Sequence, residues 1–387
     1  MIIPALTRNV SSTLSVTPVQ RGATTGAGWI FRPGASILAL IETRTACFAI
    51  GQNRVVERER CLSAVIEVRV IDSAMIRTVD SRTCRNADGL WAITSYWNPM
   101  RYRRRHANYR LFRERLKLPL LAIELAYGPE FELGDGDAEM LVQLRGRDVL
   151  WQKERLLNVA LQGLPETCRR VVWIDCDVVF ESDDWAERTN ALLDRFMLVQ
   201  PFSHLHWMPP DWEPGHGPRP DAELLWSVPF LIASGTPAGT CLGASQIERA
   251  PGYAWAADRQ FMAKHRLYDA CIIGGGDIAV ARAAYGCFEA AVSRQRLHRD
   301  HYLSWADPFH NTVRKKVAFV EGNLFHLWHG KSQHRRYYQR HEELSRFQFD
   351  PFEDIAIDHN GAWRWNSDKV DMHDYVRGYF ESRTEDG

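Results

Sequence analysis

The sequence predicts an α/β fold in which a mostly parallel, twisted sheet is flanked by helices. From Leu90 onward, short apolar strand patterns alternate with amphipathic helix patterns, as expected for a sheet covered on both faces. The segment 170–174 has a continuous apolar centre, which is typical of an inner parallel strand. This strand runs directly into Asp175-Cys176-Asp177, and the carboxyl end of a strand is where open α/β sheets bind ligands.

The first part of this pattern contains three strands and two helices. Leu90–Tyr96 is expected to form a strand, and an arginine-rich helix over Tyr102–Leu116 follows it. Leu118–Ala126 has the apolar content of a buried strand, and Glu139–Leu144 predicts a shorter one. The apolar positions of Val149–Leu161 form one stripe, which predicts a helix packed against the sheet.

The second part continues the alternation with one long interruption. We expect a helix over Trp185–Phe196 and a strand over Met197–Phe202. The stretch His204–Pro220 carries five prolines and is predicted to be a loop, long enough to serve as a lid or as an insertion that contacts the acceptor of a reaction. Helices are expected near Ala254–His265 and Ile278–Tyr285, with a glycine turn between them, and the C-terminal segment is rich in histidine and aromatic residues.

Composition bounds the class of protein. The chain has 387 residues, 45% hydrophobic and 25% charged, so it can bury a core. Its 48 basic and 48 acidic residues give no net charge, which argues against a nucleic-acid partner. No apolar run reaches the roughly 20 residues that a membrane-spanning helix needs. The eight cysteines form no CxxC pair and no secretory leader is recognised, so we expect a reducing, cytoplasmic setting, with peripheral attachment to a membrane left open.

Three segments are expected along the chain. Residues 1–88 carry Ser/Thr/Gly clusters without a sustained period, which predicts a poorly defined leader or accessory segment, with Met75 as an alternative start. Residues 89–366 form the main α/β domain. Residues 367–387 are expected to be a C-terminal tail.

Asp175 and Asp177 are the first candidate metal ligands. Residues i and i+2 of an extended chain point the same way with about 6.6 Å between their Cα atoms, so both carboxylates can address one site. Oxygen ligands of this kind suit the hard divalent cations that bind phosphates. The alternative is that the two aspartates cap the following turn. A second Asp-x-Asp sequence, Asp135-Gly136-Asp137, is interpreted as a solvated turn.

The sequence Ile273-Gly274-Gly275-Gly276-Asp277 places an acid where a helix begins. Glycines such as Gly275 let a backbone or a sugar ring approach closely. A carboxylate at a helix N-terminus is favoured in its ionised form, which suits a general base that accepts a hydroxyl proton. The alternative is that Asp277 only caps the helix.

A third candidate region, residues 324–331, follows an apolar strand over 317–320. His326 or His329 could complete a metal shell begun by the two aspartates, and Lys331 could face a phosphate. A lone histidine is more often a hydrogen-bonded structural residue. Because no HExxH motif or cysteine partner accompanies these histidines, a structural zinc site is not expected.

The arginine cluster that begins at Arg101 is the weakest signal. Most of its members are expected to form a solvated helix face. Arg103 and Arg105, nearest the strand end, could bind a diphosphate through their forked guanidinium groups. Glu124, near the end of the next strand, could hydrogen-bond a base or ribose.

At these residues the chain resembles the GT-A-fold glycosyltransferases, over about residues 90–365. Asp175-Cys176-Asp177 looks like the DxD motif of that family, which holds Mn²⁺ or Mg²⁺ against the donor diphosphate. The glycine-flanked Asp277 is similar to the base of inverting members such as the β-1,4-galactosyltransferases, although the second acid that many members carry is absent. The region of His326 and His329 is similar to the C-terminal histidine that completes the metal shell, and the loop containing Asn98 resembles the one that contacts the nucleotide.

The resemblance implies a metal-dependent, inverting glycosyltransferase of the hexosyltransferase kind. It would use Mn²⁺ or Mg²⁺ and a nucleotide-sugar donor, with a UDP-sugar expected, and a carbohydrate or glycolipid would be the acceptor. Two other classes stay open. A metal-dependent phosphohydrolase would use the same aspartates and histidines, and a non-catalytic sugar-binding module would need neither the metal nor Asp277.

Overall fold

The computed structural model describes residues 76–78, 89–243 and 247–387. Contacts divide the chain into two units, residues 1–65 and 66–387, and every described residue belongs to the second. The leader or accessory segment expected over residues 1–88 therefore lies outside the described residues, apart from strand β1 (Ile76–Thr78).

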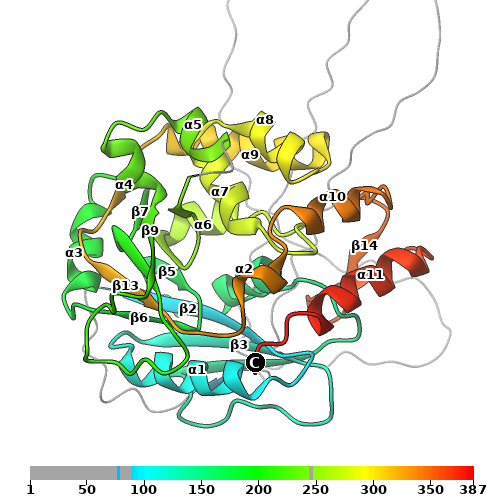
Figure 1. Ribbon diagram of the computed structural model, residues 1–387, viewed down its shortest axis with the longest axis horizontal. Coiled ribbons are helices and arrows are strands. Elements are labelled where there is room, and N and C mark those ends of the chain that lie inside the picture. Colours follow the sequence, from blue (N-terminus) through cyan, green and yellow to red (C-terminus); the bar gives the residue numbers. More distant parts are fainter. Residues whose placement is uncertain (1–75, 79–88, 244–246) are drawn as a thin grey trace, which may run out of the picture. The chain divides into compact units, whose positions relative to one another are not determined.

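Eight strands form the central sheet, part of which is labelled in Figure 1. Strands β4, β3, β2 and β5 are mutually parallel, and β7 is parallel to β12, whereas β1 and β11 run antiparallel to their neighbours. The predicted mostly parallel α/β sheet is thus confirmed. Across the sheet, β1 is followed by β4 (Met140–Arg145), β3 (Leu120–Ala126), β2 (Leu90–Trp97), β5 (Arg170–Ile174), β11 (Ala254–Asp258), β7 (Leu198–Gln200) and β12 (Val317–Phe319).

Both faces of the central sheet are buried. On β2, Trp91 and Ile93 join the apolar cluster of one face, while Leu90 and Ala92 join that of the other. Successive side chains of a strand alternate between faces, so a continuous apolar strand fits only a sheet that is covered twice. This arrangement explains the uninterrupted apolar sequence of the inner strands.

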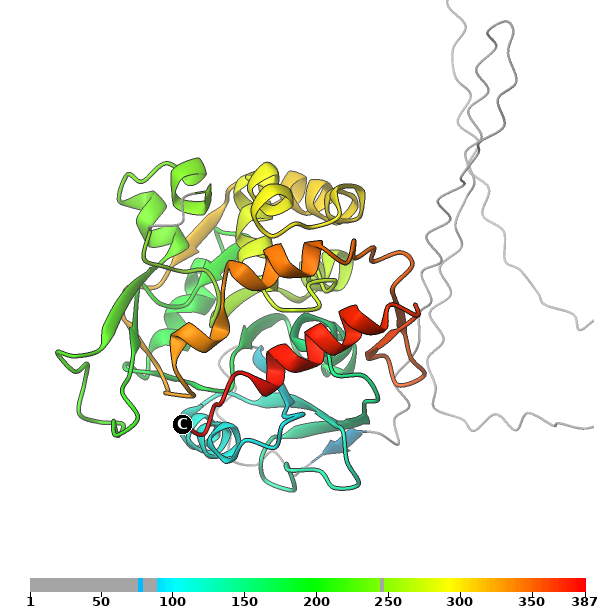
Figure 2. The same ribbon diagram turned by 45° about the vertical axis from the view of Figure 1, so that its right-hand side comes forward.

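Helices cover the first face. Their apolar residues belong to the same cluster as Trp91 and Ile93. Figure 2 shows α10 and α11, which pack on each other. The helices are α2 (Lys153–Gly163), α4 (Val228–Ala233), α5 (Ala238–Gly243), α6 (Arg259–His265), α7 (Gly276–Tyr285), α8 (Phe288–Arg294), α9 (Arg299–Val313), α10 (Gln339–Ser345) and α11 (Val370–Glu381).

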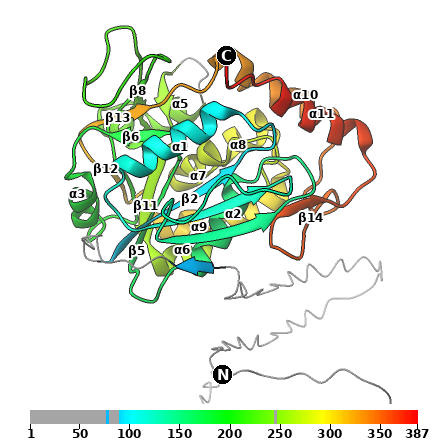
Figure 3. The ribbon, with the colours of Figure 1, turned by 90° about the horizontal axis from the view of Figure 1, so that it is seen from below.

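Helix α1 (Arg103–Arg115), helix α3 (Trp185–Leu192) and a second sheet cover the other face. Figure 3 shows α1 lying across the central sheet. A pair of short strands, β14 (Ile355–Ile357) and β15 (Trp363–Trp365), and a 3₁₀ turn at Ser332–Arg335 complete the fold. The second sheet has the order β10 (Arg249–Ala250), β9 (Glu223–Ser227), β8 (His204–Trp207), β13 (Asn323–His326) and β6 (Val178–Phe180).

Within residues 89–366, two segments differ in secondary structure from the sequence-based expectation. Residues 204–207 were predicted to be loop but form β8, because all five prolines of this stretch lie at or beyond Pro209 and leave its start free to pair. Residues 254–258 were predicted to be helix but form β11, an inner strand between β5 and β7. Alanine favours helix, but a place in the sheet buried on both faces overrides that preference.

The last 21 residues include a packed helix. In α11 the ring of Phe380 lies 5.1 Å from that of Trp97 on β2. Residues 367–387, expected above to be a tail, therefore contact the central sheet next to the candidate site. Among the residues that the structure describes, no helix is long and apolar enough to cross a membrane.

Candidate active site

A cavity of about 840 Å³ opens where β2 and β5 end. Ser95 and Trp97 of β2 and the residues that follow β5 line it, together with parts of α2, α7 and the C-terminal segment. This is the sheet edge at which the sequence predicted a site.

The structure brings seven of the eleven predicted site residues to this cavity. Two belong to helices, Arg105 in the first turns of α1 and Asp277 in the first turn of α7, and the others come from strand ends and loops. The seven are Arg105, Asp175, Asp177, Gly275, Asp277, His326 and His329.

The other four lie outside the cavity lining. Asn98 donates to a carboxylate oxygen of Glu132 at 3.0 Å, and Glu124 accepts from the Glu132 amide at 2.6 Å, so both order the loop after β3. The side chain of Arg103 is 95% exposed on the outer side of α1. Lys331 is exposed as well and precedes the 3₁₀ turn.

Asp177, His326 and His329 form a cluster whose ligand atoms all lie within 4.8 Å of one another. His329 Nε2 is 3.2 Å from Asp177 Oδ2 and 2.8 Å from His326 Nε2. Strand pairing creates this cluster: His326 on β13 lies opposite Val178 on β6, and the Leu327 amide donates to the Asp177 carbonyl at 2.8 Å. A carboxylate and two imidazoles at this spacing are suited to a divalent metal ion.

The charge states of this cluster also suit a metal. Burial and the positive charge of Arg335 hold the pKa of His329 well below its usual range, so its imidazole is neutral and able to act as a ligand. Burial alone would raise the pKa of Asp177, but hydrogen bonding and charge from His326 and the charge of Arg335 lower it. Among the residues that the structure describes, none forms a hydrogen bond with the buried Asp177 Oδ1, so this oxygen is available to a ligand.

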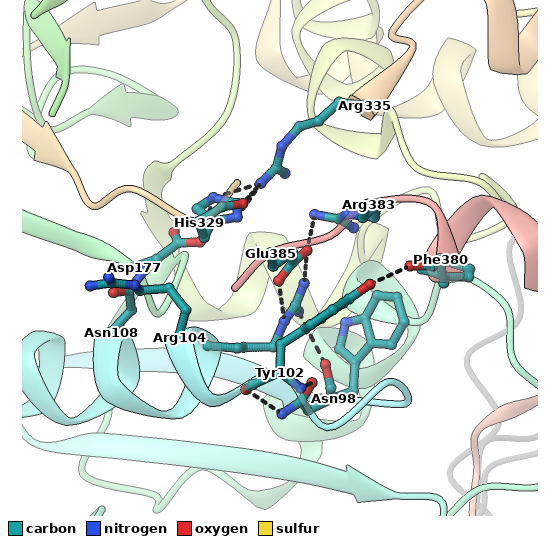
Figure 4. A network of polar contacts seen from close by, with 12 residues as sticks. Asn98, Tyr102, Arg104, Asn108, Asp177, His329, Arg335, Phe380, Arg383 and Glu385 are labelled. Atoms are coloured by element: carbon teal, nitrogen blue, oxygen red, sulfur yellow. Dashed lines mark hydrogen bonds and ion pairs between the residues drawn. The ribbon is translucent and has the colours of Figure 1, made fainter. Parts of the chain in front are cut away.

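Arg335 and Arg383 line this side of the cavity, and Figure 4 shows them with Asp177, His329 and Glu385. Arg335 donates to the His329 carbonyl at 3.1 Å. Glu385 is 1% exposed and binds the guanidinium of Arg105 at 2.7 Å and that of Arg383 at 2.7 Å. These two arginines lower the pKa of Glu385 to about 2 despite its burial.

Lys153, at the start of α2, joins the two halves of the site. Its ammonium lies 2.6 Å from Asp175 Oδ1 and 2.9 Å from both carboxylate oxygens of Asp277. Only 7% of Lys153 is exposed, so its charge is balanced by these carboxylates rather than by water. Asp175 therefore has a different partner from Asp177 and lies outside the histidine cluster, although the two acids share a cavity wall.

Two glycines make room for acids at this wall, Gly252 for Asp277 and Gly276 for Glu154. A Cβ at Gly252 would lie 2.7 Å from the Asp277 carboxylate, and a Cβ at Gly276 would lie 2.2 Å from the carboxylate of Glu154. Gly275 has φ 95°, in the left-handed region that favours glycine, immediately before α7. Burial, and next the charge of Asp277, raise the pKa of Glu154 to about 8.

Sequence reasoning missed Lys153, Glu154, Arg335 and Glu385. Three adjacent charges, Lys153-Glu154-Arg155, at the start of a helix that packs on the sheet were a usable signal, because charges that face a sheet need partners inside the protein. The position of Glu385, 280 residues from Arg105, gave no local signal at all.

Comparison with known proteins finds slight likenesses only. No protein-family profile matches the chain, and no curated protein matches it. Glucosyl-3-phosphoglycerate synthase from Mycobacterium tuberculosis, in complex with Mn²⁺, UDP and phosphoglyceric acid, is 13% identical, with a TM-score of 0.35, 67% of this chain covered and 78% of that one.

A mannosyltransferase from Pyrobaculum calidifontis in complex with GDP-Man and Mn²⁺ is 14% identical, with a TM-score of 0.34, 76% of this chain covered and 69% of that one. A 4-diphosphocytidyl-2C-methyl-D-erythritol synthase from Anaerococcus prevotii is 12% identical, with a TM-score of 0.29, 61% of this chain covered and 88% of that one. Likenesses of this size carry no argument about activity, so the function of the chain has to be argued from its own residues.

Proposed function

We propose that the chain is a metal-dependent glycosyltransferase that moves a sugar from a nucleoside-diphosphate sugar to an acceptor hydroxyl. One observation carries the proposal: two chemical groups line the same cavity. One is a cluster suited to a metal, formed by Asp177, His326 and His329, and the other is the carboxylate of Asp277 at the start of a helix. A metal in the cluster would bind the donor diphosphate, and the carboxylate would accept the proton of the acceptor hydroxyl.

Asp177, His326 and His329 would hold the metal. Mixed nitrogen and oxygen ligands favour Mn²⁺ over Mg²⁺, which prefers an all-oxygen shell. When bound, the ion would neutralise negative charge that develops on the departing diphosphate. Asp175, held by Lys153, contributes charge to the same wall without belonging to the ligand cluster.

Arginines on the same side would bind the diphosphate oxygens. Arg105, Arg335 and Arg383 line the cavity, and their forked guanidinium groups match pairs of phosphate oxygens. Arg105 is positioned by the carbonyl of Trp97 at the end of β2, to which it donates at 3.1 Å. The end of β2 would thereby position one of the residues that bind the donor.

Asp277 would act as the general base. Asp277 lies in the first turn of α7, and Lys153 binds both of its carboxylate oxygens and fixes them in one orientation. As the acceptor hydroxyl attacks the anomeric carbon from the side opposite the diphosphate, its proton passes to Asp277, and the anomeric configuration is inverted. The acceptor hydroxyl belongs to a carbohydrate or glycolipid in the simplest case.

Release of nucleoside diphosphate tests this function. The full chain is incubated with UDP- and GDP-sugars, Mn²⁺ and a panel of hydroxylated acceptors, and nucleoside diphosphate and new glycoside are measured. Asp277→Asn should lower turnover by at least 100-fold, with Mn²⁺·UDP affinity within threefold of the wild type. Asp307→Asn, an exposed aspartate of α9, is the matched control. Release of inorganic phosphate, or donor binding without turnover, would contradict the proposal.

A further inference from the structure

A second group of basic residues lines the same cavity. Arg282 comes from α7, Arg294 from the end of α8, and Arg340 from α10. Neither the proposed donor contacts nor the proposed base uses them.

This group surrounds the glycine turn that precedes Asp277. Gln295 donates to the Gly275 carbonyl at 2.7 Å and accepts from Arg282 Nη1 at 2.7 Å. A Cβ at Gly274 would lie 3.2 Å from Arg340 Nη2. The two guanidinium groups therefore lie beside the turn that fixes the position of the base.

The two buried arginines bind neutral oxygens rather than carboxylates. Arg282, which is 2% exposed, donates to the Leu242 carbonyl and to the Gln295 side chain. Arg340, which is 5% exposed, donates to the Tyr379 hydroxyl, and its Nε has no hydrogen-bond partner among the described residues. Within the part of the chain that the structure describes, no ion pair joins either of them to an acid.

Unbalanced positive charge also shows in the neighbouring groups. Burial, and next the charge of Arg249, lower the pKa of Arg282 to about 10. Burial and the charges of Arg340 and Arg282 lower the pKa of His341 well below its usual range. Buried charges in proteins are normally paired, so two buried guanidinium groups that line an open cavity indicate a ligand that supplies the negative charge.

We propose that the acceptor carries an anionic group, a phosphate or a carboxylate, which Arg282 and Arg340 bind while the acceptor hydroxyl faces Asp277. This inference rests on the proposed glycosyl transfer. Arg282 follows Asp277 by five residues on α7, about 7.5 Å along the helix axis, which a small phosphorylated or carboxylated molecule spans. Binding a remote anion would orient the hydroxyl and restrict its motion.

An acceptor panel tests the inference. With saturating donor and Mn²⁺, hydroxy compounds that carry a phosphate monoester are compared with carboxylated and neutral molecules of matched size. We expect KM for the preferred anionic class to be at least tenfold lower than for neutral molecules, and the ratio between the first two classes identifies the anion. Equal KM values for charged and neutral acceptors would overturn the inference.

Variants locate the anion. Arg282→Gln and Arg340→Gln should each raise the acceptor KM at least tenfold, with donor KM within twofold. Because both side chains are buried, each variant is first checked for an unchanged melting temperature. Arg294→Gln, at an exposed residue of the cavity, provides a second test, and we expect it to raise the acceptor KM about threefold. Arg188→Gln on the outside of α3 is the matched control. An unchanged acceptor KM in all three cavity variants would contradict the proposal.

Sulfate binding separates the two proposals. Inorganic sulfate is titrated calorimetrically into the full chain with UDP and Mn²⁺ present, at ionic strength matched with chloride. We expect sulfate to bind the wild type and to bind Arg294→Gln and Arg340→Gln at least threefold more weakly. Absence of both Mn²⁺·UDP and Mn²⁺·GDP binding would overturn the glycosyltransferase proposal, whereas nucleotide binding without sulfate binding would overturn only the anion site.

Discussion

Lys153 Nζ lies 2.9 Å from both carboxylate oxygens of Asp277, and the same ammonium is 2.6 Å from Asp175. One buried cation thus fixes two acids that come from distant parts of the chain. Asp175 follows the end of β5 and Asp277 lies at the start of α7. Lys153 holds the two carboxylates together in one wall of the cavity.

Replacing Lys153 should damage both fold and activity. Lys153→Met leaves the carboxylates of Asp175 and Asp277 buried together without a cation, which we expect to lower the free energy of unfolding by about 3 kcal/mol. Turnover should fall by at least 100-fold, because the base loses its orientation. Urea unfolding and diphosphate release measure these effects. Lys264→Met, at an exposed lysine of α6, should change neither quantity, and a stable, active Lys153→Met would refute the role of the ammonium.

The two aspartates that follow β5 should differ in metal binding. Asp177 belongs to the histidine cluster and Asp175 does not, so Asp177→Asn and His329→Ala should weaken Mn²⁺ binding at least 30-fold, whereas Asp175→Asn should weaken it less than fivefold. Isothermal titration with Mn²⁺ alone measures this without any turnover. His206→Ala is the control, since His206 bonds Asn323 and lies outside the cavity lining. Equal losses for the two asparagine variants would place Asp175 among the ligands.

Much of the site was predictable because strand ends converge. The carboxyl ends of parallel strands meet at one edge of a sheet, so the position of Asp175 and Asp177 after β5 was enough to locate a cavity wall. His326 and His329 also had a usable signal, the apolar strand before them. What the sequence did not contain was the pairing of β13 with β6, which sets His326 beside Asp177.

The rest depended on long-range packing. Glu124 was predicted to bind a nucleotide, but it accepts hydrogen bonds from the amides of Glu132 and Leu133 and orders a loop. Arg103 was predicted to face a diphosphate, but the rotation of α1 exposes it and turns Arg105 inward. Successive side chains of an α-helix differ in direction by about 100°, so a small rotation of the helix decides which residue faces the sheet. The sequence alone does not determine that rotation.

Gly252 should be needed for turnover because it leaves room for the Asp277 carboxylate, and not because of its own backbone conformation. Its φ lies outside the left-handed region, yet a Cβ there would lie 2.7 Å from the Asp277 carboxylate. Gly252→Ala should therefore displace the base and lower turnover at least tenfold, while Mn²⁺ affinity changes less than twofold. Gly239→Ala on α5, where a Cβ meets nothing within 4 Å, is the control. An alanine at position 252 with wild-type turnover would show that Asp277 tolerates displacement.

Glu154 should make stability fall as pH rises. Its pKa is about 8 in the folded chain, against an ordinary value of 4.5, so the folded state binds the proton more tightly than the unfolded state. The free energy of unfolding therefore decreases between pH 4.5 and 8, by at most about 1.4 kcal/mol per pH unit from this group. Glu154→Gln should flatten that slope, as measured by urea unfolding from pH 5 to 8. Glu166→Gln, at an exposed acid, should leave it unchanged, and an identical slope in both variants would contradict the assignment.

Glu385 should stabilise the C-terminal segment over the cavity. Glu385→Gln leaves Arg105 and Arg383 buried without a carboxylate, and we expect a loss of about 3 kcal/mol at pH 7. The pKa of Glu385 is about 2, below its ordinary value of 4.5, so its contribution is complete above pH 4.5 and is lost as the pH falls towards 2.

The difference between wild type and Glu385→Gln should accordingly shrink as the pH is lowered through that window, which urea unfolding at pH 3 to 7 measures. Glu381→Gln, at an exposed acid on α11, should cost less than 0.5 kcal/mol at every pH. Hydrogen exchange of α11 gives an independent measurement, because losing the ion pairs should speed exchange there before it affects the central sheet. A Glu385→Gln variant as stable as the wild type at pH 7 would show that the two arginines find other partners.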